Sequence, residues 1–297
     1  MENTFIPWAS PTYWGNEERY VLDAFKSSWI SGGPYVDRLE DDFKQYSGAE
    51  HVVSSSNGTT AIHMAFLALN IKPGDEIIVT DQDHEANSGV WRRLAARGLV
   101  IREWTVAPDT GELDPARLEG LLNERTRVVA FTHCSNILGQ INPVAQICAR
   151  VRAAGAISVV DGVSFAGHGL PDVDALGADI YLFSLYKTFG PHLGAMVIRE
   201  PLALRLGNQA HYFNAEHRHK WFVPAGPDHA QVAASSSVLH YLDDLCAHHA
   251  PDMPAADYPA FSRRLLHAAE QRLLPELMDF FTKDRRVRLL GPRDAAS

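Results

Sequence analysis

Two apolar runs, Ile157-Ser-Val-Val-Asp161 and Ala178-Asp-Ile-Tyr-Leu-Phe-Ser-Leu-Tyr-Lys187, indicate how the middle of this chain folds. Each run is short and continuous, which is typical of a strand buried on both faces. The first run ends in an aspartate and the second ends in a lysine. We therefore expect a carboxylate and an amine at the ends of two buried strands.

Further short apolar runs alternate with longer helical patterns on both sides of this pair. Such alternation predicts a doubly wound α/β fold, with a mostly parallel seven-stranded sheet covered by helices on both faces. The predicted strands are 51–55, 76–80, 99–104, 127–133, 157–161, 180–185 and 194–199. The predicted helices between them are 59–69, 87–97, 115–122 and 143–153.

The flanks of the chain differ from this core. Amphipathic patterns at 16–26 and 35–46 predict a helical N-terminal arm over residues 1–48, which precedes a large domain over 49–250. Helical patterns return at 228–248 and at 258–283, where Pro275 is expected to kink the helix. Val287-Arg-Leu-Leu290 is interpreted as the first strand of a small C-terminal domain that is largely missing, so 251–297 forms the third unit.

Composition and charge favour a soluble protein that acts on a small molecule. The chain has 297 residues, 46% of them hydrophobic, and its net charge of -9 disfavours nucleic acid and anionic membranes as partners. Its three cysteines form no CxxC pair, so neither a disulfide framework nor a zinc site is indicated. The first ten residues do not have the pattern of a secretion signal, and no run approaches the ~18 apolar residues of a membrane span. We expect a cytoplasmic protein.

A lysine and an aspartate at two strand ends are what a pyridoxal phosphate enzyme requires. The amine of Lys187 can form a Schiff base with the cofactor aldehyde, and the carboxylate of Asp161 can keep the pyridine nitrogen protonated. The protonated ring can then accept electrons from a substrate carbanion. Each residue alone is weak evidence.

A phosphate cradle is the second element that such a site needs. Val52-Val-Ser-Ser-Ser-Asn-Gly-Thr-Thr-Ala61 passes from a predicted strand into a helix through small polar residues. The backbone N–H groups from Gly58 onward, with the hydroxyls of Thr59 and Thr60, would bind an anion at the helix N-terminus. The alternative interpretation is a well-capped helix without a ligand.

Two further residues follow other predicted strands. His84 comes after strand 76–80, where an imidazole could stack on a planar ring and assist proton transfer. Asn136 comes after strand 127–133, where its amide could donate to the phenolic oxygen of the cofactor. The alternatives are a structural or exposed histidine and a turn-forming asparagine. A shared site is favoured because all these residues fall at the same edge of one sheet.

From about residue 83 to about residue 245 the chain resembles the class V aminotransferases, a fold type I pyridoxal phosphate family that includes cysteine desulfurases and selenocysteine lyases. The segments that carry the resemblance are Asp83-His-Glu-Ala-Asn87, Ser135-Asn-Ile-Leu-Gly139, Val160-Asp-Gly-Val-Ser164, Phe183-Ser-Leu-Tyr-Lys-Thr-Phe-Gly-Pro191 and Pro227-Asp-His229. The segment centred on the lysine is specific, and the others support it by their order and spacing.

The resemblance implies a role for each matching residue. Lys187 would be the Schiff base lysine, Asp161 the pyridinium partner and His84 the stacking base. Asn136 and Ser164 would lie near the phenolic oxygen.

Ser184 would help to hold the phosphate. Tyr186 stands where class V proteins often carry a histidine that contacts the phosphate, and a phenol can still donate a hydrogen bond there. The segment Pro224-Ala-Gly-Pro227 lacks the hydroxyl that a neighbouring subunit often contributes. The expected absence of a full C-terminal domain removes support for sulfur transfer.

Residues 1 to about 80 resemble a different group, the DegT/DnrJ/EryC1/StrS sugar aminotransferases. The segments that carry this resemblance are Ser28-Trp-Ile-Ser-Gly-Gly-Pro34, Val36-Asp-Arg-Leu-Glu40, Ser56-Asn-Gly-Thr-Thr-Ala61 and Gly74-Asp-Glu-Ile-Ile78. In that group the stretch 56–61 supplies the phosphate cradle. Both groups share a fold, so a joint near residue 80 is compatible with one sheet.

Three functions follow from these patterns. The leading hypothesis is a pyridoxal phosphate enzyme of class V type that acts on a small amino substrate, with transamination as its outcome. The alternatives are a catalytically impaired remnant that lacks its C-terminal domain and a DegT-type sugar aminotransferase. Metal binding by His211, His217 and His219 is disfavoured, because Arg218 and Lys220 lie between and beside them.

The resembled families build their sites across a two-fold interface, so we expect a homodimer. The N-terminal arm supports this expectation, since it contains Trp8, Tyr13, Trp14 and Trp29, and aromatic residues are enriched at interfaces.

Overall fold

A computed structural model describes residues 15–28, 33–56, 58–217, 220–222 and 228–292, with only the backbone described at 59, 63 and 66. A seven-stranded mixed sheet forms its centre, with the strand order β1-β7-β6-β5-β4-β2-β3. Strands β2 to β6 run parallel to one another where they pair, and β7 is antiparallel to both β1 and β6. The strands are β1 (His51–Ser55), β2 (Glu76–Thr80), β3 (Val100–Trp104), β4 (Thr126–Thr132), β5 (Ile157–Asp161), β6 (Ile180–Ser184) and β7 (Gly194–Ile198).

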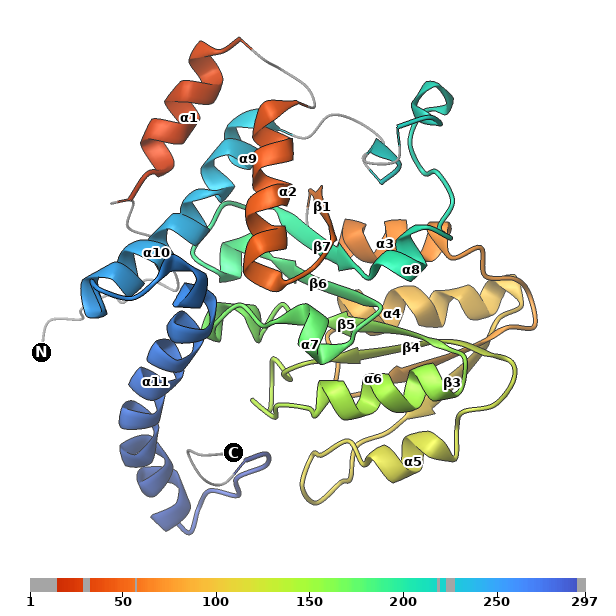
Figure 1. The fold of residues 1–297 in the computed structure, drawn as a ribbon. Helices are drawn as coiled ribbons and strands as arrows, with labels where there is room; N and C mark the ends of the chain where they lie inside the picture. The colour runs from red at the N-terminus through yellow and green to blue at the C-terminus, as the bar shows by residue number, and fades with distance from the viewer. Residues whose placement is uncertain (1–14, 29–32, 57, 218–219, 223–227, 293–297) are drawn as a thin grey trace, which may run out of the picture.

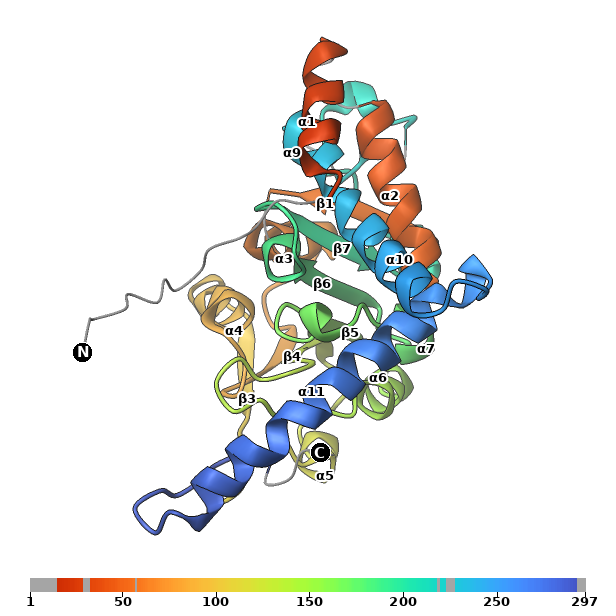
Figure 2. The same cartoon turned by 90° about the vertical axis from the view of Figure 1, so that its left-hand side faces the viewer.

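Helices cover both faces of this sheet (Figures 1 and 2). Helices α3 and α4 lie on one face, while α2, α6, α7 and α10 lie on the other. The α-helices are α1 (Glu17–Lys26), α2 (Pro34–Ser47), α3 (Gly58–Ala68), α4 (Glu85–Arg92), α5 (Pro115–Glu119), α6 (Val144–Ala153), α7 (Val173–Leu176), α8 (Glu200–Ala203), α9 (His229–Ser235), α10 (Ser237–His249) and α11 (Tyr258–Lys283). Short 3-10 turns are η1 (Arg93–Arg97), η2 (Ala166–His168), η3 (Leu185–Lys187), η4 (Tyr212–Asn214) and η6 (Ala255–Asp257).

The central strands are buried on both faces, which explains their continuous apolar sequences. In β4, Val129 and Phe131 pack into the cluster beneath α2, α6 and α10. The alternate residues Val128 and Ala130 pack into the cluster beneath α3 and α4. Because successive side chains of a strand point to opposite faces, a strand covered by helices on both sides needs apolar residues at every position. The predicted doubly wound core is therefore confirmed.

The N-terminal arm helix α2 protects the edge of the sheet. Val36, Leu39 and Phe43 belong to the main core cluster, and Glu40 is buried beside β1. The Glu40 carboxylate accepts hydrogen bonds from the Ser54 N–H at 3.1 Å and from the Ser54 hydroxyl at 3.3 Å. This contact satisfies a backbone donor on an edge strand that has no second strand partner. Burial raises the pKa of Glu40 to about 7.

The structure corrects three of the predicted elements. The pattern at 228–248 is divided into α9 and α10, and the second half of the pattern at 87–97 is a 3-10 turn. Helix α11 has the bounds predicted for this pattern and contains Pro275, and the expected kink there stays a prediction. The prediction of a strand at 287–290 is wrong, because this stretch has no regular structure. A strand needs a neighbouring strand to satisfy its backbone groups, and no described strand pairs with 287–290.

Among the described helices, none combines the length and the apolar character that crossing a bilayer requires.

The amino end of β2 carries a buried charge cluster that yields a stability prediction. The Glu76 side chain is fully buried and contacts Arg102, Arg125 at 2.6 Å and the Asn123 amide at 2.8 Å. The hydrogen bond from Arg102, with help from Asn123 and from the charge of Arg125, lowers the pKa of Glu76 to about 2. The ionised carboxylate therefore stabilises the folded state above the pKa of the unfolded chain.

We expect Glu76→Gln to reduce the free energy of unfolding at pH 7 by about 1.5–3 kcal/mol, as is typical for the loss of charged hydrogen bonds. The difference from the unmodified protein should shrink as the pH falls from about 4.5 to about 2, because the folded pKa lies below the unfolded one. Urea unfolding at several pH values measures this difference in the free energy of unfolding. The substitution Glu119→Gln, at an exposed glutamate, is the control. A difference that does not change with pH would contradict this assignment.

Candidate active site at the carboxyl edge of the sheet

The carboxyl ends of β2, β4, β5 and β6 meet at one edge of the sheet, together with the end of β1 and the beginning of α3. Three residues from three of these strand ends interact electrostatically. Asp161 is the last residue of β5, Lys187 lies in η3 after β6, and His84 precedes α4 after β2. Electrostatic interactions with His84 and Lys187 lower the pKa of Asp161 and so favour its ionised form. The three residues predicted to carry the chemistry are thus brought together.

Asp161 is buried, with 5% of its surface exposed. Burial is the largest influence on its carboxyl group and raises its pKa above the usual value, while the Val163 N–H, His84 and Lys187 act in the opposite direction. The Val163 N–H donates to Oδ1 at 2.8 Å. Within the described part of the chain, Oδ2 has no hydrogen bond. One oxygen of a buried acid is therefore available to a cationic or N–H group brought to this edge.

Lys187 is held by a tight turn that follows β6. The carbonyl oxygen of Leu185 accepts the N–H groups of Thr188 at 2.8 Å and of Gly190 at 2.9 Å, and it also accepts the Thr188 hydroxyl. Phe189 adopts a left-handed conformation with φ of 68°, which is strained for a bulky residue. A Cβ added to Gly167 would approach the Lys187 carbonyl oxygen to 2.3 Å. Only a glycine at position 167 of η2 leaves room for the backbone of Lys187 to pack against this turn.

The exposed side chain of Tyr186 flanks the lysine. Its ring stacks on His192, with the ring centroids 4.8 Å apart and the planes at 2°. The Lys187 Nζ lies 5.9 Å from the centre of the Tyr186 ring. Lys187 is an exposed residue at this edge.

The predicted phosphate cradle lies beside Ser184. Gly58 is the first residue of α3 and is buried, and a Cβ added there would come to 3.1 Å from the Ser184 hydroxyl. The Thr60 hydroxyl is 2.9 Å from the Ser56 hydroxyl. The side chain of Thr59 lies outside the described residues. The start of α3 thus brings helix N–H groups close to a buried hydroxyl, as an anion site requires.

His84 begins helix α4 and is exposed. Its Nδ1 accepts a hydrogen bond from the Ala86 N–H at 3.1 Å. When the imidazole is neutral, its proton must therefore reside on Nε2. The capping contact fixes both the ring orientation and the tautomer.

Two predicted residues have no contact that ties them to the others. Asn136 is exposed in the turn after β4, and Ser164 is half-buried in the turn after β5. Neither side chain makes a hydrogen bond with another described residue. The neighbouring Ser135 is the anchored one, since its buried hydroxyl donates to the Gln82 carbonyl at 3.3 Å and joins the loops after β4 and β2.

The sequence analysis missed an aromatic support beneath Asp161. His133 is buried and stacks on Phe165, with their ring centroids 3.7 Å apart, and its Nδ1 lies 2.9 Å from the Tyr181 hydroxyl. Burial lowers the pKa of His133 to about 3, so the ring is neutral. A Cβ on Gly162 would clash with the Tyr181 ring at 2.2 Å. The Asp-Gly pair at the end of β5 therefore fits closely over this stack.

Asp83 was also missed as a member of the site. Burial and the charge of Asp161 raise its pKa well above the usual value, so the two carboxyl groups are close enough to disfavour simultaneous ionisation. The Asn87 amide donates to Asp83 at 2.6 Å. The only signal for this residue was its place next to His84 in the segment 83–87.

Two other predictions fall elsewhere. The segment 224–227 lies outside the described residues, as does His219. His211 stacks on Phe213, with centroids 5.0 Å apart. In the described ranges, the group with metal-ligand spacing consists of Glu50, His51 and Glu200, away from the carboxyl edge, and it includes neither His211 nor His217.

The raised pKa of Asp161 yields the second prediction. Its ionised form costs stability at neutral pH, and this cost disappears at low pH, where the carboxyl group is protonated in both states. We expect Asp161→Asn to raise the melting temperature of the cofactor-free protein at pH 7 by a few degrees and to have little effect near pH 4 or below. Thermal unfolding measures this, with the exposed Asp252→Asn as the control. A lower melting temperature at pH 7 would show that the carboxylate stabilises the fold.

Comparisons with known proteins agree with this arrangement. The chain is 39% identical over 173 residues to an aminotransferase-like protein, FGM3, of Gibberella zeae, a match that covers 57% of this chain and 43% of the relative. It is 39% identical over 165 residues to a cysteine desulfurase of Serratia proteamaculans, covering 54% of this chain and 40% of the relative. The chain thus spans less than half the length of these curated relatives.

A cysteine desulfurase from Thermococcus onnurineus has a similar fold, with a TM-score of 0.74 at 21% identity over 96% of this chain and 76% of that one. Residues 36–250, which include every strand of the sheet, match the family model named Aminotransferase class-V. This chain belongs to the class V aminotransferase family.

Proposed function

We propose that this protein is a pyridoxal phosphate enzyme of class V type that acts on a small amino substrate, with transamination as its reaction. The observation that carries the proposal is the placement of His84, Asp161 and Lys187 at or just after the carboxyl ends of the parallel strands β2, β5 and β6, at one edge of the sheet. The family match supports the cofactor, because the class V aminotransferases resembled by the sequence are a pyridoxal phosphate family.

The residues at the edge fit this cofactor in charge and in the donors that they offer. Asp161 offers Oδ2 to the pyridine nitrogen, and a protonated ring would supply the cation that a buried carboxylate lacks. Gly58 and Ser184 would hold the phosphate at the start of α3, together with the N–H groups of Thr59 and Thr60. These donors are matched to a dianion, and no carboxylate is among them.

When bound, pyridoxal phosphate supplies an aldehyde that condenses with amines and a ring that accepts electrons from the substrate. Asp161 would keep a negative charge beside the ring nitrogen and so hold a proton there. Lys187 would carry the cofactor on Nζ and then, once its amine is free, accept the proton from the substrate Cα and return it. Burial of Asp161 strengthens its interaction with the ring, because water does not screen it.

The remaining predicted residues take supporting places in this proposal. His84 would stack on the ring with the tautomer that its cap enforces. Tyr186 would donate a hydrogen bond toward the phosphate, while Asn136 and Ser164 would approach the phenolic oxygen. The exposure of Asn136 supports a role that is completed only when a ligand is present.

The cysteines of this stretch of chain do not offer an activated nucleophile for sulfur transfer. Burial raises the pKa of Cys134, of Cys246 and of Cys148, the last to about 11. A thiolate is the nucleophile in sulfur chemistry, and these environments keep each thiol protonated. Elimination and racemisation would use the same lysine and aspartate. The resemblance of residues 1–80 to sugar aminotransferases remains a prediction, and the class V match begins at residue 36 within that segment.

We further propose that the protein forms a homodimer in the cytoplasm. The four aromatic residues behind this expectation lie outside the described residues. Its structural support is the exposure of Ile137, Tyr186 and Phe189 beside the candidate site, since apolar side chains around a site favour an interface there. Sedimentation at several concentrations tests the assembly, and a monomer throughout would refute it.

The proposed cofactor attachment has a direct test. Added pyridoxal phosphate should give the protein the yellow absorption of the lysine-bound cofactor, and borohydride should then fix one label on the peptide that contains Lys187. Lys187→Ala should lose both signals, while Lys26→Ala should keep them, because Lys26 lies at the end of α1. A label distributed over several lysines, or no absorption change, would rule the proposal out.

The packing of Gly167 against Lys187 gives a test of catalysis. Gly167→Ala should displace the lysine backbone, and a misplacement of about 1 Å can reduce turnover about 100-fold. Turnover of a panel of amino donors measures this loss. Gly120→Ala is the matched control, because a Cβ there has only an ordinary contact of 3.5 Å. Equal rates in both variants would exclude a catalytic role for Lys187 at this position.

A further inference from the structure

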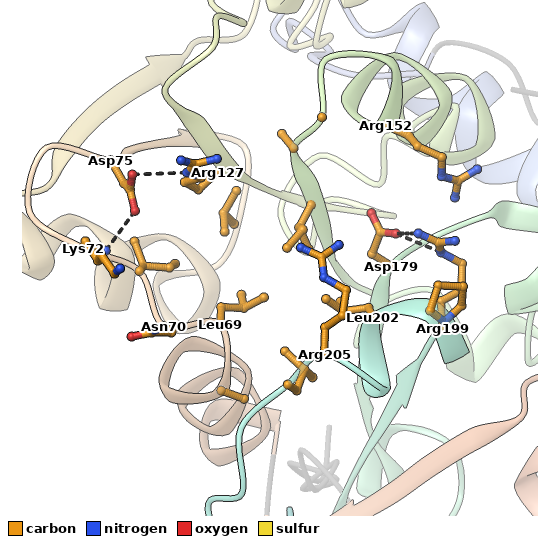
Figure 3. A pocket seen from close by; sticks show the side chains of 18 residues that line it. Leu69, Asn70, Lys72, Asp75, Arg127, Arg152, Asp179, Arg199, Leu202 and Arg205 are labelled. Atoms are coloured by element: carbon orange, nitrogen blue, oxygen red, sulfur yellow. Dashed lines mark hydrogen bonds and ion pairs between the residues drawn. The ribbon is translucent and has the colours of Figure 1, made fainter.

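A second pocket lies at the amino edge of the sheet, opposite the edge that carries Lys187 (Figure 3). It has a volume of about 530 Å³, within the range of small-molecule sites. Val128 and Ile157, near the beginnings of β4 and β5, form part of its floor. The ends of α3 and α6 and the segment from Arg199 to Leu206 complete its walls.

The charged residues in this lining are mainly cationic. The cations are Lys72, Arg127, Arg152, Arg199 and Arg205, and the anions are Asp75 and Asp179. With five positive and two negative side chains, the net side-chain charge of the lining is +3. The ends of α3 and α6 each contribute about -0.5 of a charge, so the pocket retains a net charge of about +2.

Two ion pairs fix opposite sides of the pocket. Arg127 Nε lies 3.2 Å from an Asp75 oxygen, and Arg199 Nε lies 2.9 Å from an Asp179 oxygen. Asp179 is buried and also accepts the N–H and the hydroxyl of Ser158, each at 3.0 Å. Both carboxylates are thus engaged, and neither is free to neutralise the remaining cations.

Arg205 and Lys72 are the cations of this lining that have no side-chain partner among the described residues. Within the described residues, neither side chain makes a hydrogen bond or an ion pair. Figure 3 shows the Arg205 guanidinium projecting between the Arg127–Asp75 and Arg199–Asp179 pairs. A planar guanidinium with five donors in this position is suited to phosphate oxygens.

The pocket also offers an apolar surface for an organic group. Leu69, Ile71, Leu202 and Leu206 contribute to the lining beside the floor residues. Apolar walls with a few convergent polar groups are typical of sites that bind a small organic molecule. A ligand that satisfies both features has an apolar part and at least two negative charges.

We propose that this pocket binds a small organic phosphate with two or more phosphate-type charges, with Arg205 and Lys72 as its principal contacts. The competing explanation is that these cations only complement the helix ends and keep the surface soluble. The two explanations differ in whether the chain binds an organic diphosphate at this edge. The proposal is independent of the reaction at Lys187.

Calorimetric titration of the 297-residue chain with ADP as the probe tests the proposal. ADP should bind, inorganic pyrophosphate should bind more weakly, and adenosine should show no heat of binding. The affinity for ADP should fall as the salt concentration rises, since partly exposed charges are screened. Failure of ADP to bind at millimolar concentration, or equal binding of adenosine and ADP, would overturn the proposal.

Variants locate the binding. Arg205→Ala combined with Lys72→Ala should weaken ADP binding about tenfold or more. Arg205→Lys keeps the charge but loses the planar fork, so its affinity should lie between those of the double variant and the unmodified protein. Arg272→Ala removes an exposed arginine on α11 and should leave the ADP affinity unchanged. Lys187→Ala abolishes the proposed cofactor attachment at the other edge but should likewise leave the ADP affinity unchanged. Melting curves confirm that each variant folds. Unchanged ADP affinity in the double variant, or a loss in Lys187→Ala, would place the binding elsewhere and refute the proposal.

Discussion

The buried carboxylate of Asp161 is the constraint on which the candidate site depends. Burial away from water raises the pKa of a carboxyl group, and the ionised group destabilises the folded state unless a cation lies beside it. In this fold it is placed at the end of a central strand, with His84 and Lys187 near enough to favour its charge and one oxygen left for a further partner. The site therefore offers a carboxylate oxygen and an amine. A protonated pyridine nitrogen would pair with the carboxylate, and the aldehyde of the same ring would react with the amine.

The sheet separates two kinds of chemistry at its two edges. The carboxyl edge collects Asp161, Lys187 and the start of α3, where helix N–H groups face outward. The amino edge collects helix ends, ion pairs and the cations Arg205 and Lys72, whose side chains have no partner in the described part of the chain. The strands between the two edges are packed on both faces. Residues that bind a ligand at either edge can therefore be substituted without disturbing the core.

Much of this architecture could be predicted, because a strand buried on both faces leaves a continuous apolar run, and all seven strands were located to within one residue at each end. The position of Asp161 and Lys187 after such runs located the centre of the site. The stack of His133 on Phe165 and its hydrogen bond with Tyr181 could not be predicted, since they join residues far apart in sequence, and His133 was assigned to a strand. The stretch 287–290 was misread because an apolar pattern favours a strand but does not supply its partner.

The protonation state of the cofactor ring tests the central claim most directly. Nitrogen NMR of the protein loaded with pyridoxal phosphate labelled with ¹⁵N in its ring should show a protonated nitrogen at neutral pH, and Asp161→Asn should lose that proton while the cofactor stays attached. An unprotonated nitrogen in the unmodified protein, or a protonation state that Asp161→Asn leaves unchanged, would contradict the role of this carboxylate.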